Sequence, residues 1–346
     1  MNMEKLETLL KDEKSFRKKQ IIKAVFNEFI ENFDDATNLP KDLREKLKKE
    51  FPLKIEHKLF ISDEGKSIKA LITLEDGQKI ESVLMRHKDR NTVCVSSQVG
   101  CAMGCAFCAT GKLGLTRNLN VYEILGQILL FQRLLKKENE RVSSVVFMGM
   151  GEPLLNYENV LSAVRLINDK EYFNIGIRHI SISTCGIISG IKKLAKENMQ
   201  INLALSLHFS DERKRIEFMP IERANHLTDT MSVIKEFIQK TGRKIMIEYL
   251  MLKGINDSEK DAQKLADLLI NFETEKAHGK NKAPHYFVNI IAYNPTGGFK
   301  SSDKKSINDF KNILTEKGID VVERFRFGRE ISGACGQLAL NNVCIK

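Results

Sequence analysis

The stretch GCAMGCAFCATG, residues 100–111, decides how the rest of the sequence is interpreted. It holds Cys101, Cys105 and Cys108 in the spacing C-x3-C-x2-C among small residues. Three thiolates this close together can hold three irons of a [4Fe-4S] cluster and leave the fourth iron open to another ligand. An open iron indicates chemistry, because a cluster that only carries electrons normally has a fourth protein ligand. The alternatives are a zinc site, which needs a fourth ligand, and a redox C-x-x-C pair.

The composition is that of a globular protein. Of 346 residues, 42% are hydrophobic, which is enough for a sizeable core in one catalytic region with a smaller attachment. The N-terminal run MNMEKLETLLKDEKSFRKK has no signal-peptide pattern, and no run of about eighteen apolar residues occurs. We therefore expect a cytoplasmic protein without a membrane partner. Seven cysteines, an odd number with three clustered, favour metal binding in a reducing compartment over a disulfide framework.

The formal net charge of +10 is compatible with a polyanionic partner. Lysines and arginines that neutralise phosphates gain affinity by releasing counterions. Lysines also commonly do no more than solvate helix surfaces, so the charge alone leaves nucleic acid binding open.

The chain divides near residue 90. Residues 4–50 predict helices, and Pro40 suits the first turn of the second one. The apolar residues at helical spacing are Ile21, Ile22, Val25, Phe26, Phe29, Ile30 and Phe33. In the next stretch, Asp63-Glu64-Gly65 and Glu75-Asp76-Gly77 separate apolar runs of period two, which predicts a small antiparallel meander. We expect residues 1–90 to form an accessory region and residues 91–346 the catalytic core.

From residue 92, a pattern of strand, polar loop and helix repeats six times. The expected strands are TVCVSS (92–97), VSSVVFMG (142–149), HISIST (179–184), INLALSLH (201–208), KIMIEYLML (244–252) and YFVNIIAY (286–293). Six such units predict an α/β fold with a parallel sheet curled into a partial (β/α)6 barrel. Glycine-rich and polar motifs follow the C-terminal ends of these strands, where such barrels place active sites. A doubly wound open sheet is the alternative.

Several motifs carry a family resemblance. The run VCVSSQVGCAMGCAFCATGKLGLTRNL (93–119) resembles the RlmN/Cfr family of radical S-adenosylmethionine (SAM) adenosine methyltransferases. MGMGEP (148–153), SLH (206–208), YNP (293–295) and ACGQL (334–338) follow in the same order. The resemblance implies a radical SAM barrel, an N-terminal RNA-binding region, and a cluster on the three clustered cysteines with SAM at its open iron. It also implies that SAM is bound by Gly151, Glu152, Ser183, Ser206, Leu207, His208 and Asn294. As isolated residues these would be ordinary turn or capping groups.

The resemblance also implies a mechanism. An adenine C2 or C8 carbon is not nucleophilic, so methylation there needs a radical route. Cys335 would accept a methyl group from one SAM, and a radical from a second SAM would take hydrogen from it. The carbon radical would then add to adenine and link the RNA to the enzyme. Cys94 would free the product by forming a disulfide with Cys335, and Glu81 would take the ring proton. Without the motifs, such residues would be a packed cysteine and a solvated glutamate.

Two sets of motifs bear on the substrate. GMGEP (149–153) and CVSSQVGC (94–101) resemble the RlmN branch, which methylates adenine C2 in the peptidyl-transferase region of 23S rRNA and, in some members, in a tRNA anticodon loop. FGREI (327–331) and HYFVNII (285–291) resemble the Cfr branch, which methylates C8 and confers antibiotic resistance. Ser332-Gly333 replaces the acidic and alanine residues that commonly precede ACGQL. A flavodoxin or ferredoxin is the expected reductant.

Two alternatives of other classes remain. One is a zinc-stabilised RNA-binding protein, and the other is a radical enzyme that acts on a small molecule. Cys185 and Cys344 have no role implied by the resemblance, and we expect them to be buried or incidental thiols.

Overall fold

One sheet runs through the computed structural model, which describes residues 6, 8–11, 13–272, 285–324 and 327–340. Its strand order within these residues is β1-β2-β3-β4-β7-β8-β9-β10-β11-β12. The barrel strands are β4 (Asn91–Cys94), β7 (Ser144–Phe147), β8 (Ile180–Thr184), β9 (Asn202–Ser206), β10 (Ile245–Met251), β11 (Tyr286–Ala292) and β12 (Val321–Glu323). Each pairs in parallel with the next barrel strand in this order. The predicted partial barrel and its six strands are confirmed, and β12 extends the parallel part of the sheet.

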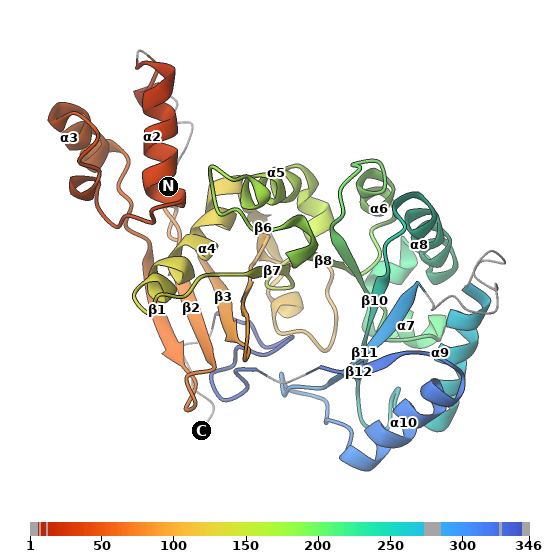
Figure 1. The fold of residues 1–346 in the computed structure, drawn as a ribbon. Helices are drawn as coiled ribbons and strands as arrows, with labels where there is room; N and C mark the ends of the chain where they lie inside the picture. Colours follow the sequence, from red (N-terminus) through yellow and green to blue (C-terminus); the bar gives the residue numbers. More distant parts are fainter. Residues whose placement is uncertain (1–5, 7, 12, 273–284, 325–326, 341–346) are drawn as a thin grey trace.

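Helices cover the outer face of the curved sheet (Figure 1). They are α4 (Val121–Lys136), α5 (Tyr157–Asn168), α6 (Ile188–Leu194), α7 (Glu212–Phe218), α8 (Leu227–Thr241), α9 (Glu259–Phe272) and α10 (Lys304–Glu316). Helix α4 shows how the sequence sets such a helix: Asn120 caps its first turn and Glu123 returns the hydrogen bond, a capping box. Its apolar side chains pack into the core from the outside, which leaves the inside of the barrel for the site.

The antiparallel meander belongs to the same sheet as the barrel. It consists of β1 (Glu56–Ile61), β2 (Ser67–Thr73) and β3 (Lys79–Arg86). Strand β3 pairs antiparallel with β4, where Val83 lies opposite Cys94. A separate hairpin of β5 (Gln98–Gly100) and β6 (Leu115–Asn118) brackets the cysteine-rich loop. The meander therefore reaches the first barrel strand directly.

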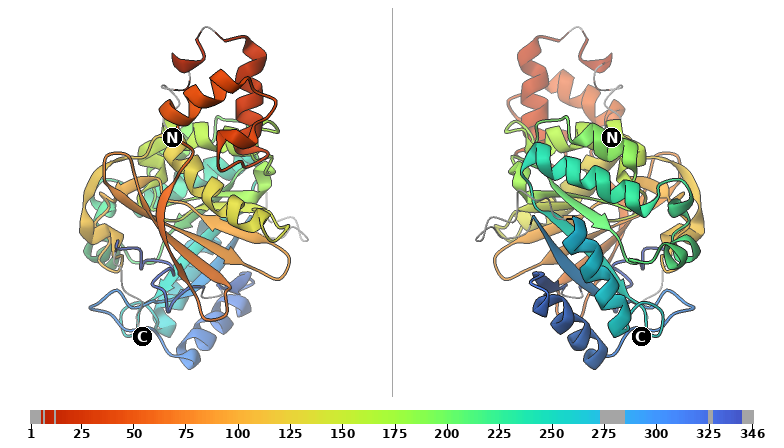
Figure 2. Two further views of the ribbon diagram at one scale, coloured as in Figure 1. Left: turned by 90° about the vertical axis from the view of Figure 1, so that its left-hand side faces the viewer. Right: turned by 90° about the vertical axis from the view of Figure 1, so that its right-hand side faces the viewer.

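The N-terminal region forms α2 (Ser15–Phe26) and α3 (Lys41–Glu50), which project beyond the sheet in both views of Figure 2. Helix α2 ends at Phe26, whereas the predicted apolar stripe continues beyond it. Phe29 has a φ of 56°, which is outside the helical range and turns the chain. Phe33 lies in a short 3-10 helix (Phe33–Asp35) and is still buried. Arg133 of α4 donates to the backbone carbonyls of Ile30 and Leu53, which ties this region to the barrel.

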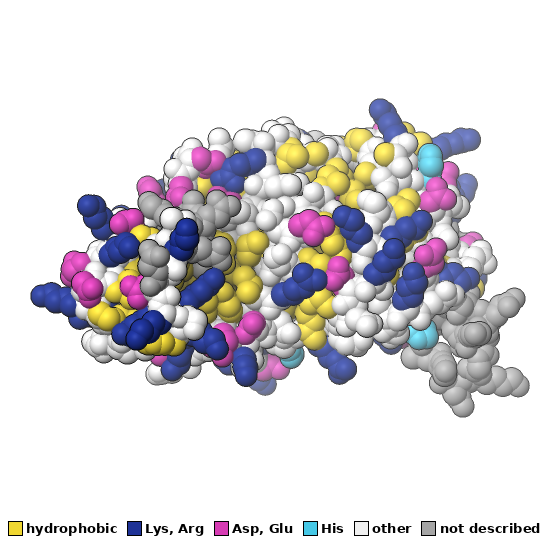
Figure 3. Space-filling model, turned by 90° about the horizontal axis from the view of Figure 1, so that it is seen from above, with side chains coloured by type: hydrophobic (Ala, Val, Ile, Leu, Met, Phe, Trp, Pro, Cys, Tyr) yellow, Lys and Arg dark blue, Asp and Glu magenta, His cyan; other side chains and the backbone are white. Residues whose placement is uncertain are grey.

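The positive charge is not gathered on one side in the view from above. Lys and Arg side chains there are interspersed with Asp and Glu (Figure 3). None of the helices formed by the described residues combines the length and the apolar character needed to cross a membrane.

Candidate active site

The cysteine-rich loop is held at its base by the β5–β6 hairpin. The Cys101 amide donates to the Gly114 carbonyl at 2.8 Å, and the Cys108 amide donates to the Cys105 carbonyl at 3.1 Å. Gly100 has a φ of 78°, and a Cβ there would lie 1.9 Å from the Gly114 oxygen, so only glycine fits. The three cysteines lie on one wall of a cavity of about 170 Å³. The local sequence thus presents three thiols to one cavity.

The donor set fits an iron–sulfur cluster. In the part of the chain that the structure describes, no three His, Cys, Asp or Glu side chains converge as ligands of a single metal ion. A [4Fe-4S] cluster instead takes each thiolate on a different iron, so its ligands surround a cavity rather than meet at a point. Burial raises the pKa of Cys101 to about 11 and raises the pKa of Cys105 further, so metal binding must displace their protons.

Gly151 and Glu152 line the same cavity and follow the end of β7. Gly151 has a φ of 98°, and a Cβ on it would lie 2.5 Å from the Cβ of Gln98. Glu152 is buried, and its carboxylate accepts from the amides of Leu154 at 3.0 Å and Cys185 at 2.8 Å. Burial raises the pKa of Glu152, which these hydrogen bonds oppose. The result is an oriented carboxyl group that faces the cysteines.

The next two strands supply the floor of the cavity. The hydroxyls of Ser183 (β8) and Ser206 (β9) are 3.0 Å apart. His208 has a φ of 58°, and its Nδ1 accepts from the Leu250 amide at 3.2 Å, which leaves Nε2 as the protonated nitrogen of the neutral ring. Burial lowers the pKa of His208 to about 3, so the ring is neutral at physiological pH. Leu207 points into the core instead and lines neither cavity of the site.

Asn294 and Cys335 come from the C-terminal part of the chain. The Asn294 amide donates to the Cys335 carbonyl at 3.3 Å, and its buried Oδ1 has no hydrogen-bond partner among the described residues. The Ala109 amide donates to the Gly336 carbonyl at 2.8 Å, and the Thr110 hydroxyl donates to the Leu338 carbonyl at 2.6 Å. The Cys335 segment therefore lies directly on the cysteine-rich loop, and an unsatisfied acceptor is left for a ligand.

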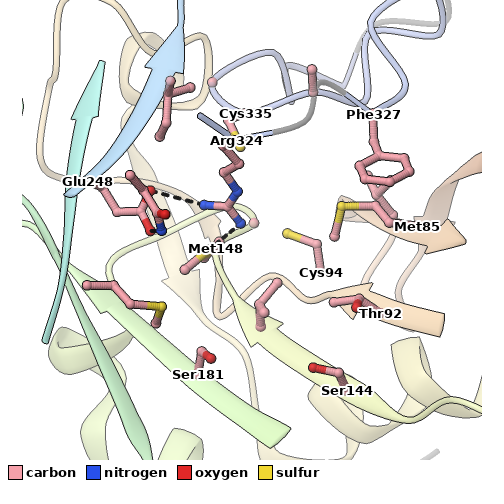
Figure 4. A pocket seen from close by; sticks show the side chains of 18 of the residues that line it. Met85, Thr92, Cys94, Ser144, Met148, Ser181, Glu248, Arg324, Phe327 and Cys335 are labelled. Carbon is pink, nitrogen blue, oxygen red and sulfur yellow. Dashed lines mark hydrogen bonds and ion pairs between the residues drawn. The ribbon is translucent and has the colours of Figure 1, made fainter. Parts of the chain in front are cut away.

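A second cavity, of about 580 Å³, occupies the inside of the barrel. Cys94, Met148, Glu248, Arg324 and Cys335 line it (Figure 4). Of these, all but Cys94 also line the cavity that holds the clustered cysteines. Burial, reinforced by the neighbouring Cys335, raises the pKa of Cys94 to about 12. The two cysteines, far apart in sequence, thus share one cavity.

Glu81 is on a strand of the meander, but its side chain is not in contact with solvent. Its side chain is fully buried, and its Oε1 lies 2.8 Å from the Lys69 Nζ. Its Oε2 accepts from the amides of Ala339 and Leu340, at 2.8 and 3.1 Å. Glu81 lines neither cavity. In this conformation it anchors the segment that follows Cys335.

Cys185 and Cys344 are the two cysteines to which the resemblance assigns no role. Cys185 is buried, as expected, and burial raises its pKa well above the ordinary value. It also lines the cavity of the clustered cysteines. Cys344 lies outside the described residues.

Two charged residues of the site were not indicated by the sequence patterns. Glu248 is an acidic residue within the apolar strand KIMIEYLML (244–252), and its isolation there is a signal that could have marked it. Arg324 lies in the charged run VVERFRFG (321–328), where nothing distinguishes it from a surface residue. Only the parallel pairing of β11 and β12 brings it inside the barrel.

A partial parallel barrel with three cysteines on one loop, which share a cavity with a glycine–glutamate turn, defines a radical SAM enzyme. The model of the radical SAM superfamily matches residues 95–266, and that of the ribosomal RNA large subunit methyltransferase N-terminal domain matches residues 1–53. Superfamily members use a [4Fe-4S] cluster and SAM, which favours the cluster over zinc. The chain belongs to the RlmN family of radical SAM methyltransferases.

The relatives cover nearly the whole chain. A protein of Dictyoglomus thermophilum named "probable dual-specificity RNA methyltransferase RlmN" is 45% identical over 94% of this chain and 91% of its own. The "ribosomal RNA large subunit methyltransferase N" of Nitrosopumilus maritimus is 40% identical over 95% and 93%. The crystal structure of a radical SAM methyltransferase from Sphaerobacter thermophilus has a TM-score of 0.90 and 37% identity, and the match covers 99% of this chain and 98% of that one.

Proposed function

We propose that this protein is an RNA methyltransferase that methylates C2 of an adenosine in the peptidyl-transferase region of 23S rRNA, and of an anticodon-loop adenosine in tRNA. The names of the relatives support RNA as the substrate and the RlmN branch over the Cfr branch. One observation carries the chemistry: Cys94 and Cys335 share a cavity that adjoins the clustered cysteines. A methyl carrier and its resolving thiol need this arrangement.

The cofactor-binding residues would have distinct tasks. Cys101, Cys105 and Cys108 would hold the cluster. Gly151, Glu152, Ser183, Ser206, His208 and Asn294 would hold SAM through their side chains or backbone, and Leu207 through its backbone. When bound, the cluster and two SAM molecules per turnover supply one methyl group and one hydrogen-abstracting radical. The Glu152 carboxylate is already fixed by two amides, so it can accept from an ammonium or ribose group without reorganising.

Cys335 would carry the transferred carbon. Its thiol is exposed to the cavity, so it can accept the methyl group and then hold the methylene that adds to adenine. The Cys94 thiolate would attack the Cys335 sulfur and release the methylated base. The unpaired electron that the radical addition leaves on the adduct would return to the oxidised cluster. Glu81 would remove the ring proton. It can do so only after the Ala339 and Leu340 amides leave its carboxylate, so we propose that the C-terminal segment shifts when RNA binds.

The N-terminal region and the electron donor also have proposed roles. Residues 1–90 would contribute RNA contacts, because the N-terminal domain model of a ribosomal RNA methyltransferase matches residues 1–53 of this region. A flavodoxin or ferredoxin would supply electrons in the cytoplasm. A Cfr-like C8 reaction is the competing outcome.

The test is mass spectrometry of nucleosides from ribosomal and transfer RNA of a deletion strain. We expect 2-methyladenosine to disappear from both pools, and to return with the wild-type gene but not with Cys335→Ala. Recovery of 8-methyladenosine instead would overturn the C2 assignment. No change in either pool would overturn the RNA assignment altogether.

A further inference from the structure

Arg324 is held inside the barrel by three strands. Its backbone amide donates to the Ile290 carbonyl of β11 at 2.9 Å. Its guanidinium donates to Glu248 Oε2 at 3.2 Å and to Met148 Sδ at 3.0 Å. Glu248 is itself oriented by Asn289, whose side-chain amide donates to Oε1 at 2.9 Å. The position of the guanidinium is therefore fixed before any substrate binds.

The guanidinium lies where the two cavities meet. Arg324 and Cys335 line both of them. Figure 4 shows the Arg324 side chain extending into the cavity below Cys335, with Glu248 on one side and Cys94 on the other. The side chain is 25% exposed, and its contacts with Glu248 and Met148 use two of the five N–H donors of an arginine. A cation with spare donors thus stands between the two cysteines.

Cys94 needs such a cation. The thiolate, not the thiol, is the nucleophile in disulfide formation. Burial and the neighbouring Cys335 raise the pKa of Cys94, while the positive charge of Arg324 lowers it. Within the described residues, Arg324 is the one cationic side chain that lowers the pKa of this thiol. Without it, the backbone hydrogen bond from Met148 would be left to offset the cost of forming a buried thiolate.

We propose that Arg324 is a positioning residue that stabilises the Cys94 thiolate while it attacks the sulfur of Cys335, an inference that rests on the proposed function. In this step the S–S bond forms and the bond between the Cys335 sulfur and the methylene carbon breaks. The electron pair of that bond leaves with the carbon, which takes a proton and becomes the methyl group of the product. An external dithiol then reduces the disulfide with two electrons. Glu248 keeps the guanidinium in place.

The first test follows the covalent intermediate in anaerobic holoenzyme with an RNA substrate. Arg324→Gln should keep the methylated Cys335 but accumulate about tenfold more RNA attached to Cys335 than wild type, because a nearby cation is worth about one pKa unit or more to a thiolate. The amount of RNA attached to Cys335 in Arg324→Lys should lie between those in Arg324→Gln and wild type. Cys94→Ala gives the amount that accumulates when release is blocked completely. Arg165→Gln, which removes an exposed arginine on α5, is the charge control. A wild-type level of adduct in Arg324→Gln would overturn the proposal.

The second test needs no RNA, and so separates this inference from the proposed function. Iodoacetamide labelling of Cys94 in holoenzyme, followed peptide by peptide with mass spectrometry, should be about tenfold slower in Arg324→Gln. If that variant does not fold, Glu248→Gln decides, because loss of the carboxylate that keeps the guanidinium in place should also make the labelling slower. An unchanged rate in the folded variant excludes the role of Arg324, whereas absence of RNA methylation by wild-type enzyme contradicts the proposed function alone.

Discussion

Glu81 and Lys69 form an ion pair that is removed from solvent: the Oε1–Nζ distance is 2.8 Å and the side chains are 0% and 1% exposed. The two residues lie on neighbouring strands of the meander, and Glu81 also accepts hydrogen bonds from two backbone amides of the C-terminal segment. Each charge of the pair is thus balanced by the other inside the protein. The contribution of this buried pair to stability can be measured by removing one partner or both.

Removal of one partner should be strongly destabilising, because it leaves an uncompensated buried charge. Lys69→Met should lower the free energy of unfolding by about 3–5 kcal/mol, and Lys69→Met combined with Glu81→Leu by less. Urea denaturation under anaerobic conditions measures both. Lys66→Met, at an exposed pair on the same meander, is the matched control and should change little. Equal stability of Lys69→Met and wild type would contradict the burial of the pair.

Cluster binding should depend on each of the three clustered cysteines. Cys101→Ala, Cys105→Ala and Cys108→Ala should lose the brown colour and most of the bound iron, since a cluster left with two ligands is poorly held. Cys185→Ala, which changes a thiol in the same cavity, should keep its iron. Iron analysis and visible absorption after anaerobic purification provide the measurement. Colourless wild-type protein with stoichiometric zinc would be the opposite result.

The methyl group on Cys335 gives a separate test. Tryptic peptides that contain Cys335 should carry an added methyl group in wild-type protein and lack it in Cys101→Ala, because we propose that cluster-bound SAM donates it. Peptide mass spectrometry distinguishes the two. Active enzyme with an unmodified Cys335 would rule out the proposed carrier.

Gly151→Ala should weaken SAM binding at least about tenfold, because the new methyl group would collide with Gln98 and move the turn that positions Glu152. Gly254→Ala is a suitable control: its φ of 72° imposes a similar backbone strain, but nothing lies within 4 Å of the added Cβ. Equilibrium dialysis of SAM against holoenzyme separates collision from strain. Similar losses in both variants would point to strain alone.

His208 should make the protein less stable in mild acid. Its pKa falls from 6.5 to about 3 on folding, so between these values the unfolded chain binds a proton that the native protein does not. Stability is therefore lost as the pH falls below about 6.5, by about 2 kcal/mol at pH 5. His208→Gln should lose less stability than wild type over this interval in anaerobic denaturation. Parallel pH curves for the two proteins would contradict a neutral buried ring.

The sequence predicted those features that depend on local periodicity or on contiguous motifs. The six barrel strands were recognisable because each is a short apolar run followed by a polar loop, and the cysteine-rich loop is continuous in sequence. The end of α2 was not predicted, because Phe29 continues the apolar spacing while its backbone leaves the helix. Burial of Glu81 and the position of Arg324 depend on contacts between segments far apart in sequence, which no local pattern encodes.

The shared hydrogen bonds between β3 and β4 limit how an RNA can be received. A hinge between the meander and the barrel would have to break this ladder, so the two parts move together as one rigid surface. Any nucleic acid that touches both must therefore supply the adjustment itself. The target adenosine would leave its stack and pay the unstacking cost, of a few kcal/mol, from the RNA side of the complex. Loosely stacked loop adenosines are then favoured by their own flexibility, before any base is read.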